Sequence, residues 1–316
     1  MAFNKFRQTV HKGIRYYKEN GAKAFTVHCL EKLRISGGAT HKIKIRINPL
    51  VNKNVFIPKE NFNNEFEAWE KALQTDCRIA VQCHVFYVDL FAELKGKLSG
   101  IPYSYDLYIT TDTDEKAQYI RENLDDSIKA RCVDIETMPN EGRDVIPFLK
   151  QMRPVFVDYD YICHLHTKKT KHTEFGEIWR RASYETLLGS AGQIRQLFGL
   201  FQQDKKIGLI FPHIIEYAPY IVINWSFERP EAEILWKRMQ FKGILPQQII
   251  FPAGSMMWLR TEAVRQLLML LINSDEIPPE EGQTSGTIIH AIERLWVYVA
   301  EENGYDFRQV GSSKES

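Results

Sequence analysis

Two clusters of polar and charged residues have side chains suited to binding an anionic ligand. The first reads Pro139-Asn140-Glu141-Gly142-Arg143-Asp144, and the second reads Cys163-His164-Leu165-His166-Thr167-Lys168-Lys169 and continues to His172. Asn and Gly tolerate unusual backbone angles, but a plain turn needs neither the Arg nor the Asp. Arg and Lys are the residues that bind phosphate oxygens. The clusters therefore indicate an anion site, although an ordinary turn and a solvated Lys/His loop would give the same residues.

Apolar segments between the clusters predict the elements that position them. Residues 145–149 form an apolar run, and a strand-like run follows over residues 155–163. The second cluster then lies just past the carboxyl end of a buried strand, with its Lys and His side chains together. In open α/β sheets this is the edge where ligands bind.

His164 and His166 alternate, so in a strand they share one face. As metal ligands they would need a third His or a carboxylate nearby, and the adjacent Lys residues repel a cation. The pattern favours a polar lining for an anionic ligand and predicts no metal. Lys168 and Lys169 could neutralise two phosphate charges without a divalent ion.

Two further groups of residues could do chemistry. Gly254-Ser255 lies in an apolar run, where a Ser nucleophile is one interpretation, but Met256 and Met257 follow it and the strand-turn-helix setting of a nucleophile elbow is missing. A close backbone approach at Gly254 is the favoured reading. Near the end of the chain, candidate acid or base groups are Glu281, His290 and Glu293. Glu293 and Arg294 could equally form a structural pair.

Alternating strand and helix patterns predict an α/β domain with a mixed, mainly parallel sheet. Strands are expected at residues 79–86, 105–111, 129–136, 159–164, 207–211 and 249–260, the last of them interrupted by Pro252 and Gly254. Helices are expected at residues 65–73, 89–98, 114–123, 145–152, 177–188, 192–202, 230–239, 261–271 and 287–302. The domain boundary is placed in the irregular segment 49–64, which gives a basic helical extension at residues 1–64 and the main domain at residues 65–316.

The amino-terminal segment differs in charge from the rest of the chain. Residues 1–46 hold 11 Lys/Arg and two Glu, which leaves 30 of the 41 basic and 38 of the 40 acidic residues for the rest. The apolar residues recur at helical spacing among the cations, a pattern typical of a helix on an anionic membrane surface. The same apolar face could instead pack on the main domain.

The composition excludes several classes of protein. With 44% hydrophobic and 26% charged residues, this is an ordinary globular chain. No apolar run is long enough to cross a bilayer or to serve as a signal peptide, so a cytoplasmic protein is expected. The five Cys residues form no C-x-x-C pair, which argues against structural zinc and a disulfide framework. The acidic main domain argues against a nucleic-acid partner.

Over residues 78–305 the sequence resembles the rhamnan synthesis protein F family of bacterial polysaccharide glycosyltransferases. The segments that carry the resemblance are His84-Val85-Phe86-Tyr87, residues 105–111, 139–149 and 164–169, Trp179-Arg180, residues 187–190, 252–260, Gly286-Thr287 and residues 290–294.

The resemblance implies a nucleotide-diphospho-sugar transferase of the GT-A type that adds rhamnose from dTDP-rhamnose to a lipid-linked glycan. No metal cofactor is expected, because His164-Leu165-His166 stands where many such enzymes keep a metal-binding Asp-x-Asp. Residues expected to bind the donor nucleotide or sugar are His84, Tyr87, Thr110, Thr111, Asn140, Gly142, Arg143, Asp144, His164, His166, Lys168 and Lys169. Residues expected to bind the acceptor or sugar are Gly254, Ser255, Trp258 and Arg294. The resemblance also implies that the transfer takes place on the cytoplasmic face of the inner membrane, in O-antigen or capsule assembly.

One position departs from the family pattern. An Asp commonly precedes the Gly-Thr pair, and here that position is Ser285. If that Asp is the base elsewhere, this chain must use Glu281 or Glu293. Two alternatives to an enzyme stay open: a non-catalytic subunit that binds a nucleotide sugar or glycan, and a membrane-tethered scaffold of the assembly machinery.

Overall fold

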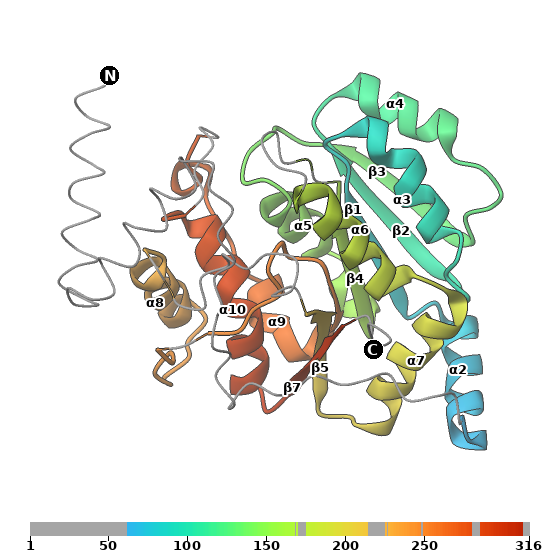
Figure 1. Cartoon of the computed structure of the whole chain (residues 1–316). Helices are drawn as coiled ribbons and strands as arrows, with labels where there is room; N and C mark the ends of the chain where they lie inside the picture. The colour runs from blue at the N-terminus through green and yellow to red at the C-terminus, as the bar shows by residue number, and fades with distance from the viewer. Residues whose placement is uncertain are drawn as a thin grey trace.

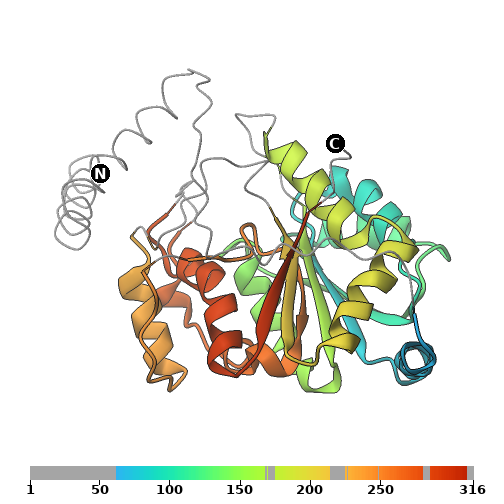
Figure 2. The same cartoon turned by 60° about the horizontal axis from the view of Figure 1, so that its bottom comes forward.

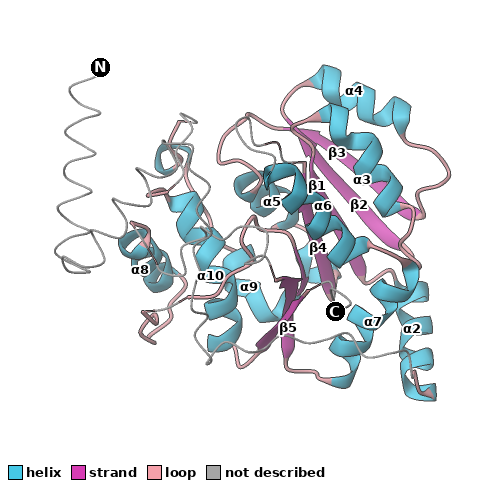
Figure 3. Ribbon diagram, in the orientation of Figure 1, coloured by secondary structure: helices cyan, strands magenta, loops and turns pink. Residues whose placement is uncertain are grey.

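A computed structural model describes residues 62–167, 169, 175–213, 225, 227–247, 249–279 and 285–311. Within this part of the chain, seven strands form one sheet in the order β3-β2-β1-β4-β6-β5-β7 (Figures 1 and 3). The strands of the first half are β1 (Ile79–His84), β2 (Tyr105–Thr111), β3 (Ala130–Thr137) and β4 (Tyr161–His166). Those of the second half are β5 (Ile207–Pro212), β6 (Met257–Arg260) and β7 (Asp306–Val310).

The sheet is mixed because one strand runs against the others. β1 to β4 are parallel to one another, and β5 is parallel to β7. β6 lies between β4 and β5 and is antiparallel to both. The chain builds outward from β1 to β3 and then returns to place β4 on the other side of β1, so the strand order reverses between β1 and β4. Such a reversal is where ligands bind in open α/β sheets.

Helices cover both faces of the sheet (Figure 2). The helices of the described residues are α2 (Asn64–Asp76), α3 (Phe91–Leu98), α4 (Asp114–Asn123), α5 (Val145–Met152), α6 (Phe175–Leu188), α7 (Ala191–Gln203), α8 (Arg229–Arg238), α9 (Arg265–Leu268) and α10 (Ile288–Glu302). One core joins a sheet face to α5, α8, α9 and α10, and a second joins the other face to α2, α3, α4, α6 and α7.

β1 is buried along its whole length and divides its side chains between these two cores. Ile79, Val81 and Cys83 pack in the α3/α6 core. The alternate residues, Ala80, Gln82 and His84, point to the α5/α10 side because side chains alternate along a strand. The polar members of this second set sit where an ordinary buried strand would have apolar residues.

Three helices have a short polar residue at the N-cap position, whose side chain accepts a hydrogen bond from a backbone N–H group of the first turn. Asn63 accepts a hydrogen bond from the Phe66 backbone N–H before α2, at 2.8 Å. Thr113 and Ser190 do the same for α4 and α7. α2 is then held against α7 by a bidentate pair in which Arg195 donates to both oxygens of Glu70, at 2.7 Å each.

The predicted α/β class and the mixed, mainly parallel sheet are confirmed. The strand at 105–111 and the helices at 114–123 and 145–152 have the expected bounds. The strand expected within residues 155–164 begins later, because residues 156–158 form a 3-10 helix and β4 covers residues 161–166. His164 lies in the strand as expected, and His166 is its last residue rather than a residue beyond it.

Three predictions for the second half were wrong or incomplete. Of the strand expected at residues 249–260, only β6 forms, because the expected interruption at Pro252 and Gly254 extends over the whole segment before it. Gly254 and Ser255 have positive φ angles of 79° and 57°. The helix expected at 261–271 is a 3-10 turn followed by the short α9. β7 was missed.

Residues 1–61 lie outside the described residues, so the basic helical extension and the boundary at residue 64 stay predictions. Within the described ranges, no helix combines the length and the apolar character that spanning a membrane demands.

The Glu70–Arg195 pair generates a stability prediction. Burial would raise the pKa of Glu70, but the hydrogen bonds and charge of Arg195, together with the nearby Tyr103 hydroxyl, outweigh it and hold that pKa below its usual value. Replacing Arg195 with Ala leaves a mostly buried carboxylate unpaired, and we expect the free energy of unfolding in urea at pH 7 to fall by about 2 kcal/mol. The double variant Glu70→Gln/Arg195→Ala should be more stable than Arg195→Ala alone, because no carboxylate is left unpaired. A double variant whose free energy of unfolding is no higher than that of Arg195→Ala would contradict this account.

Candidate functional site

Polar side chains form two rows across the carboxyl ends of three neighbouring strands. In the outer row, His84 of β1 is in register with Thr110 of β2 and His166 of β4. In the inner row, Gln82 is in register with His164. All five residues are buried. The strand pairing thus brings together residues that are far apart in sequence, at the point where the strand order reverses.

A chain of hydrogen bonds with one fixed direction runs through the inner row. The Ile109 carbonyl can only accept, so it takes the Gln151 amide N–H at 3.3 Å. The Gln151 oxygen is left to accept from Gln82 Nε2 at 3.1 Å, and the Gln82 oxygen faces His164 Nδ1 at 2.7 Å. His164 Nδ1 must therefore carry a proton. The main chain of β2 sets the tautomer of a histidine two strands away.

Asp144 lies at the other nitrogen of this histidine, with Oδ2 3.4 Å from His164 Nε2. Nε2 can donate to the carboxylate only when both ring nitrogens are protonated. Burial would raise the pKa of Asp144, but His166, His164 and His84 outweigh it and hold this pKa well below its usual value. The pocket thus contains a fixed negative charge among imidazoles.

The backbone before Asp144 is shaped to present this carboxylate. Gly142 and Arg143 have consecutive positive φ angles of 72° and 59°. A side chain at position 142 would collide with Ile146 on the first turn of α5. Asp144 occupies the N-cap position of α5 but makes no capping hydrogen bond with its side chain. An Asp at the N-cap position ordinarily accepts a hydrogen bond from the helix backbone. The Asp144 carboxylate instead faces His164.

The neighbours of His84 determine its tautomer. Thr110 Oγ1 accepts from Gln82 Nε2 at 3.2 Å and lies 2.9 Å from His84 Nδ1. The Gln82 N–H, the Thr110 hydroxyl and His84 Nδ1 all have a hydrogen-bond partner if the hydroxyl donates to Nδ1. In that arrangement the proton of the neutral His84 ring lies on Nε2. Burial lowers the pKa of His84 to about 4, so the ring is neutral at pH 7. Nε2 is buried and has no hydrogen-bond partner among the described residues.

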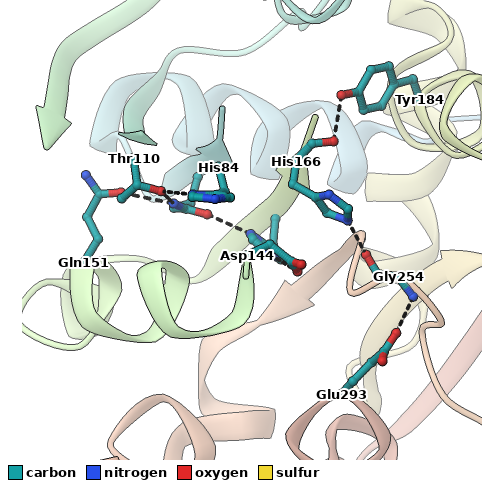
Figure 4. Close-up of polar contacts among 10 residues, drawn as sticks. His84, Thr110, Asp144, Gln151, His166, Tyr184, Gly254 and Glu293 are labelled. Atoms are coloured by element: carbon teal, nitrogen blue, oxygen red, sulfur yellow. Dashed lines mark hydrogen bonds and ion pairs between the residues drawn. The ribbon is translucent and has the colours of Figure 1, made fainter. Parts of the chain in front are cut away.

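His166 begins a second branch that reaches the last helix. Its Nε2–H donates to the Gly254 carbonyl at 2.6 Å, and the Gly254 N–H donates to Glu293 Oε1 at 2.5 Å (Figure 4). Ser255 N donates to the Pro252 carbonyl, which closes a turn that requires positive φ at Gly254. A β-carbon at Gly254 would also lie 3.0 Å from the Trp179 ring. The backbone approach predicted at Gly254 is therefore present.

A third contact joins the Gly142-Arg143-Asp144 turn to α10. Arg143 lies 3.1 Å from His290 Nε2, which must accept because a guanidinium only donates. His290 Nδ1–H then donates to Thr287 Oγ1 at 2.7 Å. His290, predicted as an acid or base candidate, is held as a neutral ring between two partners.

Glu228, just before α8, is a buried carboxylate that the sequence did not single out. Its Oε1 accepts from the Gly286 N–H at 2.7 Å, next to Ser285. Its Oε2 lies 3.9 Å from Arg294 Nε, and neither atom has a hydrogen bond among the described residues. Burial raises the pKa of Glu228 although Arg294 opposes the shift. Arg294 thus has a structural partner other than the predicted Glu293.

Lys169 and Tyr87 lie at the rim of the site. Lys169 pairs with Asp89 on the surface, and its ammonium group stands 5.3 Å from the centre of the Tyr87 ring. The Tyr87 backbone N–H donates to Thr167 Oγ1 at 2.9 Å, which ties the segment after β1 to the end of β4. Lys168 and Glu281 lie outside the described residues, so their roles stay predictions.

Four predicted residues stand apart from the polar rows. Thr111 donates its hydroxyl to the Val85 carbonyl at 2.8 Å. Asn140 is exposed in the loop before Gly142, and Ser255 is buried in the Pro252 turn. Trp258 is 0% exposed in the α6/α7 core, and its indole N–H donates to the Leu187 carbonyl.

Like Glu228, the site residues Gln82 and Gln151 were missed by the sequence analysis. Both are polar residues inside apolar runs, and each is buried. Such residues are buried only when they are hydrogen-bonded, which is the signal that could have identified them. Across the described ranges, no group of three or more His, Cys, Asp or Glu is placed to hold a metal ion. Metal independence itself stays a prediction.

Residues 48–305 match the family described as Rhamnan synthesis protein F. The chain belongs to this family. It is also similar to a protein named "Uncharacterized protein WxcX" from two strains of Xanthomonas campestris pv. campestris, with 27% identity over 238 residues in each case. That alignment covers 71% of this chain and 32% of the relatives. The chain therefore spans about a third of the length of these proteins.

The His84 environment predicts a pH dependence of stability. A histidine with a lowered folded-state pKa destabilises the fold as the pH falls below its unfolded pKa, because only the unfolded chain then binds the proton. From pH 6.5 to pH 5 this should cost roughly 2 kcal/mol. The contribution of Asp144 disappears only at lower pH, since its pKa is depressed.

We expect urea unfolding at pH 7 and pH 5 to show a smaller difference for His84→Gln than for the unmodified protein, because Gln keeps a polar contact and does not titrate. An equal pH dependence of the two proteins would contradict this description of His84.

Proposed function

We propose that this protein is a glycosyltransferase that moves a sugar, L-rhamnose from dTDP-L-rhamnose, to a lipid-linked glycan in the synthesis of a bacterial surface polysaccharide. Membership of the Rhamnan synthesis protein F family supports the substrate class. The observation that carries the proposal is the buried group of His84, Asp144, His164 and His166 at the reversal of the strand order. A mixed sheet with its site at this place is what a GT-A type nucleotide-diphospho-sugar transferase would have.

The proposed reaction is a single displacement. A carboxylate takes the proton of the acceptor hydroxyl, whose oxygen forms a bond to the anomeric carbon of the donor sugar. The bond from this carbon to the phosphate oxygen breaks, and dTDP leaves with the electron pair. Of the two carboxylates predicted as the base, Glu293 is the one with a described position, and its Oε1 accepts from the Gly254 N–H. Charge that grows on the diphosphate would be met by Lys169 and Arg143, with Lys168 expected beside them.

Membrane attachment forms part of the proposal. The 11 cations of residues 1–46 would hold the protein on the anionic inner face of the cytoplasmic membrane, close to a lipid-linked acceptor. The alternative is that the protein binds a nucleotide sugar at this site without transferring the sugar, as a binding subunit of the assembly machinery. An assay for rhamnose transfer distinguishes the two functions.

Thermal unfolding with nucleotides in EDTA tests the donor site. A ligand that binds only the folded protein raises the melting temperature by mass action. We expect dTDP and dTDP-L-rhamnose to raise it without a divalent ion. If no nucleotide or nucleotide sugar shifts the transition, the proposed donor site is contradicted.

Two matched Lys variants test whether Lys169 at the rim of the site contributes to sugar transfer. Lys169 and Lys97 each form a surface pair with an acidic residue, Asp89 and Glu185 respectively, but only Lys169 lies at the carboxyl edge of β1 and β4. Lys169→Ala should lower rhamnosyl transfer roughly 10-fold or more because the leaving diphosphate loses a cation. Lys97→Ala should leave transfer and melting temperature unchanged. Equal activity of the two variants would remove Lys169 from the mechanism.

A further inference from the structure

Asp144 and His84 each leave one polar atom without a partner in the same buried group. Asp144 Oδ2 is near His164, whereas Oδ1 receives no hydrogen bond from the described residues. The Asp144 side chain is 15% exposed, so a ligand can reach it. His84 is 4% exposed, and its Nε2–H has no partner among those residues.

The two atoms are complementary in hydrogen bonding. The carboxylate oxygen only accepts. Among the described residues, His84 Nδ1 is the acceptor available to the Thr110 hydroxyl hydrogen, so Nδ1 accepts and His84 Nε2 carries the proton. Both side chains adjoin the end of β4, because Asp144 contacts His164 and His84 is in register with His166 on the same strand (Figure 4). A buried N–H without a partner is costly, which points to a ligand atom that satisfies it.

The charges indicate which kind of ligand atom fits. A phosphate would meet the negative charge of Asp144 at short range and be repelled. An ammonium group could pair with Asp144 but would present a hydrogen to the His84 N–H, donor against donor. A neutral hydroxyl satisfies both atoms, because it donates to Asp144 Oδ1 and accepts from His84 Nε2–H.

We propose that Asp144 and His84 form a subsite for a hydroxyl group of the donor sugar, and that the diphosphate binds outside it, toward the cations of the rim. This inference rests on the proposed function, because it locates the sugar within the nucleotide-sugar site. It assigns the negative charge of Asp144 to sugar recognition. This subsite would also explain why the Asp144 side chain makes no capping hydrogen bond to α5, since its carboxylate is then available to the ligand.

Calorimetric titration of the full chain with dTDP and with dTDP-L-rhamnose tests the subsite. Asp144→Asn replaces a charged acceptor with a neutral amide of the same size, and a hydrogen bond to a charged group is a strong one. The Kd for dTDP-L-rhamnose should rise roughly 10- to 100-fold, while the Kd for dTDP stays the same or falls. Asp126→Asn, an exposed surface change, should alter neither Kd.

The outcomes separate this inference from the proposed function. Equal weakening of both ligands, or no change, would contradict the sugar subsite while leaving the nucleotide site in place. An unmodified protein that binds neither ligand would contradict the proposed function and the subsite with it.

A second measurement does not depend on how well Asp144→Asn folds. In protein labelled with ¹⁵N-histidine, His84 should show a protonated Nε2 in the free protein. Its Nε2 resonance should shift with dTDP-L-rhamnose and stay in place with dTDP. A shift of the same size with both ligands would overturn the assignment.

Discussion

The site depends on one constraint: the main-chain carbonyl of Ile109 can accept a hydrogen bond but cannot donate one. This fixes the Gln151 amide, which fixes Gln82, and Gln82 in turn fixes His164. Thr110 accepts from Gln82, and its own hydrogen goes to His84 Nδ1, the acceptor within reach among the described residues. Every polar group in a buried row must find a partner of the right kind, since an unmatched one costs about 1–3 kcal/mol. Two amides therefore give two histidines defined tautomers before any ligand arrives.

Backbone geometry supplies the second constraint. Gly142-Arg143 and Gly254-Ser255 are two pairs of consecutive residues with positive φ, and they lie on the two sides of the histidines. Conformations of this kind persist where surrounding contacts hold them, and they concentrate at functional sites. Here Arg143 is held through His290, and Gly254 through His166 and Glu293. The last helix thus supports both turns, although it follows them by many residues in sequence.

Much of the site could be predicted because its residues combine polar type with strand periodicity. The alternation of His164 and His166 predicted a shared face, and the turn around Asn140 to Asp144 stood out because its Arg and Asp are unnecessary in a plain turn. The partners of these residues could not be predicted, since they depend on register. Nothing near Gln82 in sequence indicates that it pairs with position 164 and bonds to Gln151. Glu228 resembled an exposed residue ahead of a helix.

The predicted strands were wrong or incomplete where tertiary contacts override local sequence signals. Residues 249–255 are as apolar as a strand, but they form a loop whose side chains pack in the α8/α10 core, and Ile250 N–H donates to the Tyr298 hydroxyl instead of a neighbouring strand. β7 pairs in parallel with β5 at the sheet edge, a contact that depends on the return of the chain after α10. Such pairings are set by the whole domain rather than by the segment itself.

The central claim is that the donor binds at the carboxyl ends of β1 and β4, and amide hydrogen exchange tests it most directly. With dTDP-L-rhamnose in excess, the account predicts slower exchange in the segments 84–87, 142–146 and 164–167 and around Gly254, with the opposite edge of the sheet unchanged. Protection confined to other regions, or no protection at a concentration that raises the melting temperature, would contradict it.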